Sequence, residues 1–139
     1  MDKKGLILGF VKKHKIAVFS TVNEKCKPES AIMEFGETEN LELIFDTFYN
    51  SRKYKNLQTN KNMAVVIGGE EDVTVQYEGE AKELTPDEVG KYKKYFFAKL
   101  PEAQKWEKQE GIAYFKIIPK WIRYLNTNKD PWETFEITF

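Results

Sequence analysis

The sequence predicts an α+β domain in which a mainly antiparallel β-barrel carries two or three helices. Short segments rich in β-branched and aromatic residues recur along the chain, and several alternate apolar with polar residues in the period of a strand. Short polar turns join these segments, whereas parallel strands need crossovers of about a dozen residues or more. Because the chain has 139 residues and no linker-like stretch, residues 1–139 are predicted to form a single domain.

The strand predictions follow from alternation and from side-chain type. Residues 73–84 alternate most clearly, which places an apolar set that begins with Val73 and Val75 on the face expected to be buried. The segment IAVFSTV is followed by a polar turn cluster and a second apolar run, which is typical of a hairpin. The predicted strands are 16–22, 30–35, 41–48, 63–67, 73–84, 112–118, 121–125 and an alternating C-terminal segment 135–139.

Three segments have helix signals. The basic and apolar start of the chain predicts a short amphipathic helix, and residues 51–60 are a second candidate. The third has the clearest start, because Thr85-Pro86-Asp87-Glu88 combines an N-cap hydroxyl, a proline at the first helical position and a glutamate three residues after the cap. Pro101 is expected to end this helix or to begin another that ends near Gly111.

Composition excludes several classes of protein. Lys and Arg number 22 and Asp and Glu number 22, and this zero net charge argues against a nucleic-acid-binding protein. No apolar run approaches the ~18 residues of a membrane span, so no membrane partner is expected. The single cysteine, Cys26, permits no internal disulfide, and the chain lacks the Cys/His spacing of zinc sites. We therefore expect a cytoplasmic protein without a metal site.

Local charge is uneven although the total is zero. Residues 51–61 carry four basic side chains and no acid, whereas residues 70–88 are strongly acidic. If Ser51 or the preceding asparagine caps a helix, Arg52 and Lys53 lie in its first turn, where the helix dipole disfavours a cation and favours an anion. The free N–H groups, a hydroxyl and two cations would then form a small anion site. The alternative is an ordinary solvated face rich in lysine.

One motif carries a family resemblance. Thr47 is followed by Ser51-Arg52-Lys53 and then by Asn56-Leu57, within the stretch LELIFDTFYNSRKYKNLQTNKNMAVVI. Together with the segments PESAIMEF and VTVQYEGEAKEL, this order resembles the pyridoxamine 5′-phosphate oxidase-like family of FMN-binding split barrels. The resemblance implies a split antiparallel β-barrel with Greek-key character, and a homodimer whose flavin sites lie at the interface.

The resemblance also implies FMN as the cofactor and a set of residues around it. The Ser-Arg-Lys step and Thr47 are expected at the phosphate and ribityl chain, whereas Ile32 and Thr74 are expected near the ring system. The implied cofactor-binding residues are Ser30, Ala31, Ile32, Asp46, Thr47, Ser51, Arg52, Lys53 and Thr74. No side chain is assigned as a catalytic acid or base, and Trp121 and Arg123 either face the flavin of the opposite subunit or pack.

Two departures from the family pattern narrow the expected activity. Glu29 and Glu34 stand on the strand where pyridoxamine oxidases carry basic residues, so phosphate neutralisation would depend on Arg52 and Lys53. The chain ends in NTNKDPWETFEITF, without the Arg-x-His segment that holds pyridoxal phosphate, which argues against pyridoxamine oxidase activity. We expect a flavin-dependent oxidoreductase acting on a small molecule. The alternatives are a non-catalytic flavin or haem carrier, sensor or stress-related protein of the same fold, and an interaction module that has lost the cofactor.

Overall fold

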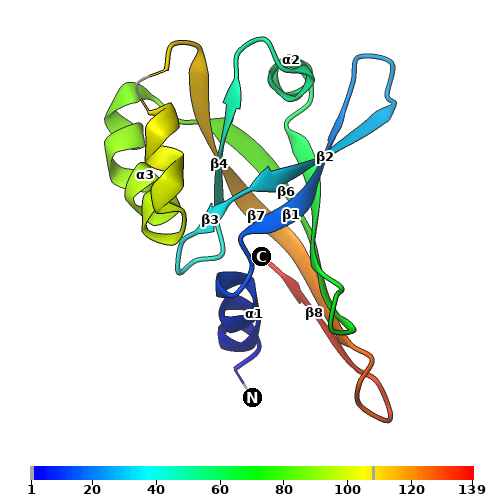
Figure 1. The fold of residues 1–139 in the computed structure, drawn as a ribbon. Coiled ribbons are helices and arrows are strands. Elements are labelled where there is room, and N and C mark those ends of the chain that lie inside the picture. The colour runs from blue at the N-terminus through cyan, green and yellow to red at the C-terminus, as the bar shows by residue number, and fades with distance from the viewer. Residues whose placement is uncertain (1, 108) are drawn as a thin grey trace.

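The computed structural model describes residues 2–107 and 109–139, and most of them lie in β-strands that curl into a half-barrel (Figure 1). In chain order the elements are α1 (Lys3–Lys12), β1 (Ile16–Val22), β2 (Pro28–Glu34), β3 (Gly36–Glu37), β4 (Leu43–Phe48), α2 (Arg52–Thr59), β5 (Asn62–Gly68), β6 (Val73–Glu83), α3 (Pro86–Lys99), the 3₁₀ helix η1 (Pro101–Trp106), β7 (Ile112–Asn126) and β8 (Glu133–Thr138).

The strands form one eight-stranded sheet in the order β2-β1-β5-β6-β7-β4-β3, with β8 paired to β7. Every pairing is antiparallel, and β1 with β5 and β4 with β7 are neighbours despite their separation along the chain. The predicted mainly-β α+β fold with a split antiparallel barrel is therefore confirmed.

The two strands predicted at 112–118 and 121–125 are one continuous strand, so that prediction was wrong. In β7, Pro119 is opposite Gly79 and Trp121 is opposite Glu78, which leaves Lys120 as one extra residue in a β-bulge. A bulge tolerates proline, because the missing N–H falls where the regular ladder is already interrupted. The proline that suggested a turn therefore bends the strand without ending it.

The helix starts agree with the sequence signals. Ser51 caps α2, and Thr85 and Glu88 form the reciprocal hydrogen bonds of a capping box at the start of α3. Pro101 begins a second helical segment, as expected, but this is a short 3₁₀ helix that ends at Trp106 and does not reach Gly111.

Two apolar clusters hold the fold together. The first fills the concave side of the sheet and includes Phe19, Phe45 and Tyr77. The second lies where α3 and η1 cover the other side of β4 and β7, and it includes Ile44 and Phe96. The helices therefore cover one part of the barrel, and Figure 1 shows no helix over the outer side of β1 and β2.

This uncovered side carries a contiguous set of exposed apolar side chains. Val18 pairs with Ile32 on one side and with Val66 on the other, so the three lie in one row across the sheet. Ile16 lies on the same face of β1, and all four side chains are exposed.

Among the described residues, no helix is both long and apolar enough to cross a membrane.

Candidate functional site

The start of α2 lies beside the end of β4. The Ser51 hydroxyl accepts a hydrogen bond from the backbone N–H of Tyr54 at 3.2 Å and contacts the Thr47 hydroxyl at 2.8 Å. The N–H groups of Arg52 and Lys53 occupy the first two helical positions, where helix geometry supplies no intrahelical acceptor. Two hydroxyls and two free N–H groups therefore meet at the positive end of the helix dipole.

Arg52 and Lys53 are the two cations of this first turn, and they differ in their surroundings. The Arg52 side chain is 72% exposed and pairs with Glu29, with 3.2 Å between Nη1 and Oε2. Lys53 is half-buried and has no acidic partner among the residues that the structure describes. Burial, and secondly the Arg52 charge, lower the pKa of Lys53. A partly buried ammonium without a counter-ion favours an anionic ligand at this point.

Strand β2 forms the opposite wall. A pocket of about 90 Å³ is lined by Thr21, Glu29, Ser30, Ala31, Arg52 and Lys53. Ser30 turns its hydroxyl outward to Ser20 at 2.7 Å, whereas Ala31 faces the concave side of the sheet. The structure thus brings four of the predicted cofactor residues, two from β2 and two from α2, around one small cavity.

Three buried or half-buried polar side chains at this site were not among the predicted cofactor-binding residues, although Asn56 belongs to the sequence motif and Glu29 was expected on the neighbouring strand. Asn56 is 5% exposed, and its Nδ2 donates to Thr21 Oγ1 at 2.9 Å and to Glu29 Oε1 at 2.8 Å. A weak signal existed for Thr21, since the period of two places this hydroxyl on the same face as buried Phe19. No local pattern could have paired Glu29 with Asn56, because 27 residues separate them.

Three predicted residues, Asp46, Thr74 and Ile32, do not line the pocket within one chain. Asp46 points to the opposite face of β4 from Thr47 and lies opposite Tyr114 in the ladder. Thr74 is on β6, and β1 and β5 separate it from β2, a span of about 14 Å along the sheet at the usual strand spacing. Ile32 is 69% exposed on the uncovered face. The cofactor roles of these three residues, like those of the other six, stay predictions.

Trp121 and Arg123 both interact with a residue of the same chain. Trp121 Nε1 donates to Glu136 Oε1 at 2.6 Å, and Arg123 Nη2 donates to Glu136 Oε2 at 3.1 Å. The guanidinium of Arg123 lies 5.5 Å from the centre of the Trp121 ring. Within one chain these side chains therefore pack against each other on the exposed side of β7 and β8.

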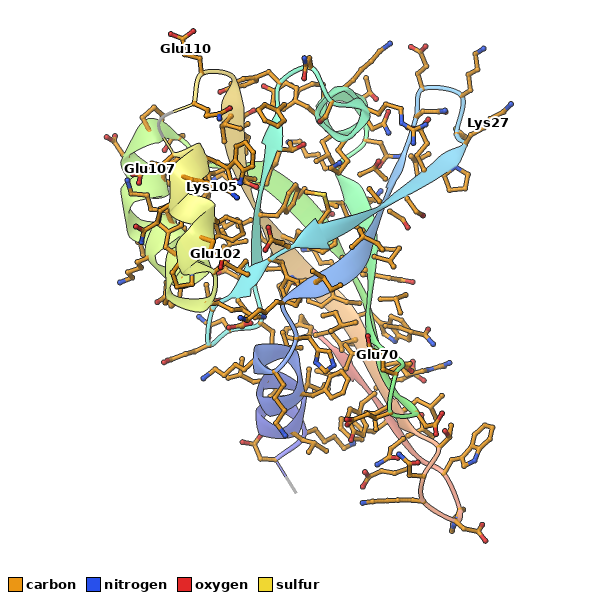
Figure 2. The ribbon with its side chains drawn as sticks, in the orientation of Figure 1. Lys27, Glu70, Glu102, Lys105, Glu107 and Glu110 are labelled. Carbon is orange, nitrogen blue, oxygen red and sulfur yellow. The ribbon has the colours of Figure 1, made fainter. Side chains whose placement is uncertain are left out.

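The acidic segment starts away from α2 and returns to it, because the Tyr54 hydroxyl of α2 donates to Glu83 Oε1 at 2.8 Å. Figure 2 shows Glu70 in the turn between β5 and β6, away from α2, whereas Lys27 extends from the β1–β2 hairpin on the side of α2. The anion site thus lies apart from the start of the acidic segment. Among residues 2–107 and 109–139, no cluster of His, Cys, Asp and Glu could hold a metal ion.

The chain is similar to a known protein family and to several solved structures. The family model described as pyridoxamine 5′-phosphate oxidase matches residues 5–126. General Stress Protein 26 from Bacillus anthracis is 25% identical with a TM-score of 0.75, and the match covers 99% of this chain and 100% of that one. No curated protein matches the chain.

Two further solved structures share the fold at lower identity. A pyridoxamine 5′-phosphate oxidase-related, FMN-binding protein from Nostoc punctiforme is 11% identical with a TM-score of 0.76, and the match covers 100% of this chain and 97% of that one. A heme-binding protein from Mycobacterium smegmatis is 11% identical with a TM-score of 0.79, and the match covers 93% of this chain. This chain spans only 55% of the heme-binding protein. The length of the family match nevertheless settles the classification, and the chain belongs to the pyridoxamine 5′-phosphate oxidase family.

Proposed function

We propose that this protein binds FMN and uses it in a redox reaction on a small molecule. The observation that carries the proposal is the first turn of α2. There the Ser51 and Thr47 hydroxyls meet beside two free N–H groups. Arg52 and the half-buried Lys53, which has no acidic partner among the described residues, line a pocket against β2. Family membership and the FMN-binding relative from Nostoc punctiforme support the choice of ligand.

The residues present fit the phosphate end of FMN. Lys53 and Arg52 would neutralise the phosphate, and the Ser51 hydroxyl with the two N–H groups would donate hydrogen bonds to it. Thr47 would hold the ribityl chain, and the backbone of Ser30 and Ala31 would lie beside the ring system. When bound, the flavin supplies hydride or electron transfer, and the protein supplies position and electrostatics.

The pocket is too small to enclose a whole flavin. Its volume of about 90 Å³ suits a phosphate group, whereas pockets that bury a drug-sized ligand measure about 300–1,000 Å³. We propose that a second copy of the chain covers the ring and that Ile16, Val18, Ile32 and Val66 form part of this homodimer interface. Contiguous exposed apolar residues are typical of such surfaces. A monomeric mass by light scattering at micromolar protein would contradict the dimer.

The central test is a visible absorbance spectrum of the purified protein with and without added FMN, followed by a titration. We expect flavin bands in the protein fraction and a large loss of FMN affinity in Arg52→Ala/Lys53→Ala. Lys27→Ala/Lys61→Ala is the matched control, because it also removes two positive charges but leaves the first turn of α2 intact. Failure of the wild-type protein to bind saturating FMN would refute the proposal. Reduction of the bound flavin by NADH or NADPH and its reoxidation then test the redox role.

A haem-binding role is the second candidate, and one cavity favours it. A pocket of about 280 Å³ is lined by His14 together with the exposed apolar residues Ile16, Val18, Ile32 and Val66. Histidine is a common axial ligand of haem iron, and His14 is the only histidine in the chain. The same spectra distinguish the candidates, since a Soret band after haem addition that is lost in His14→Ala would support haem binding.

A further inference from the structure

Glu29 places its carboxylate against Arg52, one of the two cations of the anion site. Its Oε2 accepts from Arg52 Nη1 at 3.2 Å and from Asn23 Nδ2 at 3.4 Å, and its Oε1 accepts from Asn56 Nδ2 at 2.8 Å. Hydrogen bonding from Asn56, followed by that from Asn23 and the charge of Arg52, lowers the pKa of Glu29. The carboxylate is therefore ionised at neutral pH.

The Glu29 carboxylate lies between two cavities. Glu29 and Arg52 both line the 90 Å³ pocket against β2, and both also line a cavity of about 290 Å³ between the β1–β2 hairpin and α2. Figure 1 shows the hairpin and α2 side by side at the same end of the barrel. The Glu29–Arg52 pair thus lies at the boundary between the phosphate pocket and a larger solvent-facing cavity.

The donors that hold Glu29 are the kind that bind phosphate. A guanidinium and side-chain amides donate to carboxylate and phosphate oxygens alike, and charge-assisted hydrogen bonds of this kind are the stronger ones. The two partners on α2 differ in burial. Asn56 is buried and also holds Thr21, whereas the Arg52 side chain is 72% exposed and its ion pair is of the weak surface type. Arg52 can therefore change partner while Glu29 and Asn56 stay in place.

We propose that Glu29 is a resident anion that competes with a ligand phosphate for Arg52, so that phosphate binding exchanges the Glu29–Arg52 pair for an Arg52–phosphate pair. This inference rests on the proposed function, since it concerns the regulation of the same site. Glu29 remains beside the bound phosphate and repels it. The site therefore binds flavins with a phosphate more weakly than its cations and N–H groups alone would allow.

The experiment compares FMN with riboflavin, which lacks the phosphate, by flavin fluorescence titration of wild type and Glu29→Gln. At 4 Å the interaction of two unit charges in water changes a binding constant by a factor of about five, so we expect Glu29→Gln to bind FMN about fivefold more tightly. Riboflavin affinity should stay unchanged. Glu24→Gln is the matched control, because Glu24 lines the same 290 Å³ cavity but makes no ion pair with Arg52.

Two results would overturn the inference. The first is an FMN affinity in Glu29→Gln that does not rise relative to riboflavin. The second is an equal rise in Glu24→Gln, which would indicate a general charge effect. In an Arg52→Gln background the gain from Glu29→Gln should be smaller, because the exchange partner is missing. Glu29→Ala repeats the test if Glu29→Gln fails to fold.

A third probe separates this inference from the proposed function. If no variant binds either flavin, the FMN proposal fails, and binding of inorganic pyrophosphate measured by calorimetry then decides the role of Glu29. Tighter pyrophosphate binding in Glu29→Gln than in wild type supports the resident anion. Equal binding in both proteins refutes it.

Discussion

The hydroxyls of Thr47 and Ser51 lie 2.8 Å apart, and this contact joins the end of β4 to the cap of α2. Thr47 is buried, so its position is determined by the packing of the strand. Ser51 in turn accepts the N–H of Tyr54 and sets where the helix begins. The sheet thereby places the first turn of α2, and with it the two cations of the anion site.

The cap and the anion site can be separated by substitution at Ser51. Ser51→Ala removes the capping oxygen and should lower the free energy of unfolding by about 1 kcal/mol. Ser51→Asp retains a capping oxygen but adds a negative charge, so it should remain as stable as wild type while losing FMN affinity. Urea unfolding and FMN titration of both variants check this. Equal FMN affinity in Ser51→Asp and wild type would contradict a phosphate site at the cap.

A buried ion pair joins α3 to β3 and α1. Lys99 Nζ lies 2.6 Å from Glu37 Oε1, 3.1 Å from the carbonyl of Val11 and 3.8 Å from the centre of the Phe35 ring. The two charged side chains are only 8% and 9% exposed. Lys99→Met leaves a buried carboxylate without its partner and should cost about 3 kcal/mol of stability.

The control for this prediction is Lys129→Met, whose partner Glu133 lies in an exposed pair four residues along the chain. That substitution should change the free energy of unfolding by less than about 0.5 kcal/mol. Glu37→Gln in the Lys99→Met background should restore part of the loss, because it removes the unpaired charge. Denaturant unfolding of the four proteins measures each value, and equal losses in the two Met variants would contradict the structural role of the pair.

Asp46 predicts a pH dependence of stability. Burial, and secondly the charge of Glu34, raise the pKa of Asp46 to about 6. The folded protein then binds this proton more tightly than the unfolded chain does. The contribution of Asp46 to the free energy of unfolding is therefore greatest below the ordinary pKa of an aspartate and is lost as the pH rises to about 6. Because the side chain is partly solvated, we expect a loss of about 1 to 2 kcal/mol across this range.

Asp46→Asn isolates this contribution. The unfolding free energies of the variant and wild type are measured at several pH values from 4 to 7. As the pH rises to about 6, the stability of the variant relative to wild type should increase by about 1 to 2 kcal/mol, and above that pH it should stay constant. A difference that does not change with pH would show that Asp46 titrates at its ordinary value. Tyr114, opposite Asp46, does not interfere, because burial raises its pKa to about 12.

The bulge in β7 requires a glycine on β6. A Cβ built on Gly79 would lie 2.4 Å from the carbonyl oxygen of Ile118, so Gly79→Ala forces the backbones apart. We expect a loss of about 1 to 3 kcal/mol in stability. The control is Gly90→Ala in α3, where a Cβ meets nothing within 4 Å, and this change should stabilise the helix by about 0.5 to 1 kcal/mol. Thermal unfolding that shifts in the same direction for both would contradict the steric explanation.

Sequence reasoning predicted the elements whose causes are local. The capping box at Thr85 and the cap at Ser51 depend on residues three or four positions apart, and the structure has both. Alternation likewise placed Val75 and Tyr77 of β6 on the buried face. The division of β7 into two strands was wrong, because Pro119 is accommodated by a bulge whose partner, Gly79, lies about forty residues earlier in the chain.

The sequence by itself determined the fold class, the family motif and the concentration of positive charge at the start of α2. Each of these depends on residue type and short spacing. Only the tertiary structure decided which side chains meet across the anion site. It places Glu29 of β2 against Arg52 and Asn56, so that one cation already has a partner, while Lys53 is left half-buried with no acidic partner among the described residues. The reason is that the curl of the sheet, and not the order of the chain, brings the β1–β2 hairpin to the side of α2.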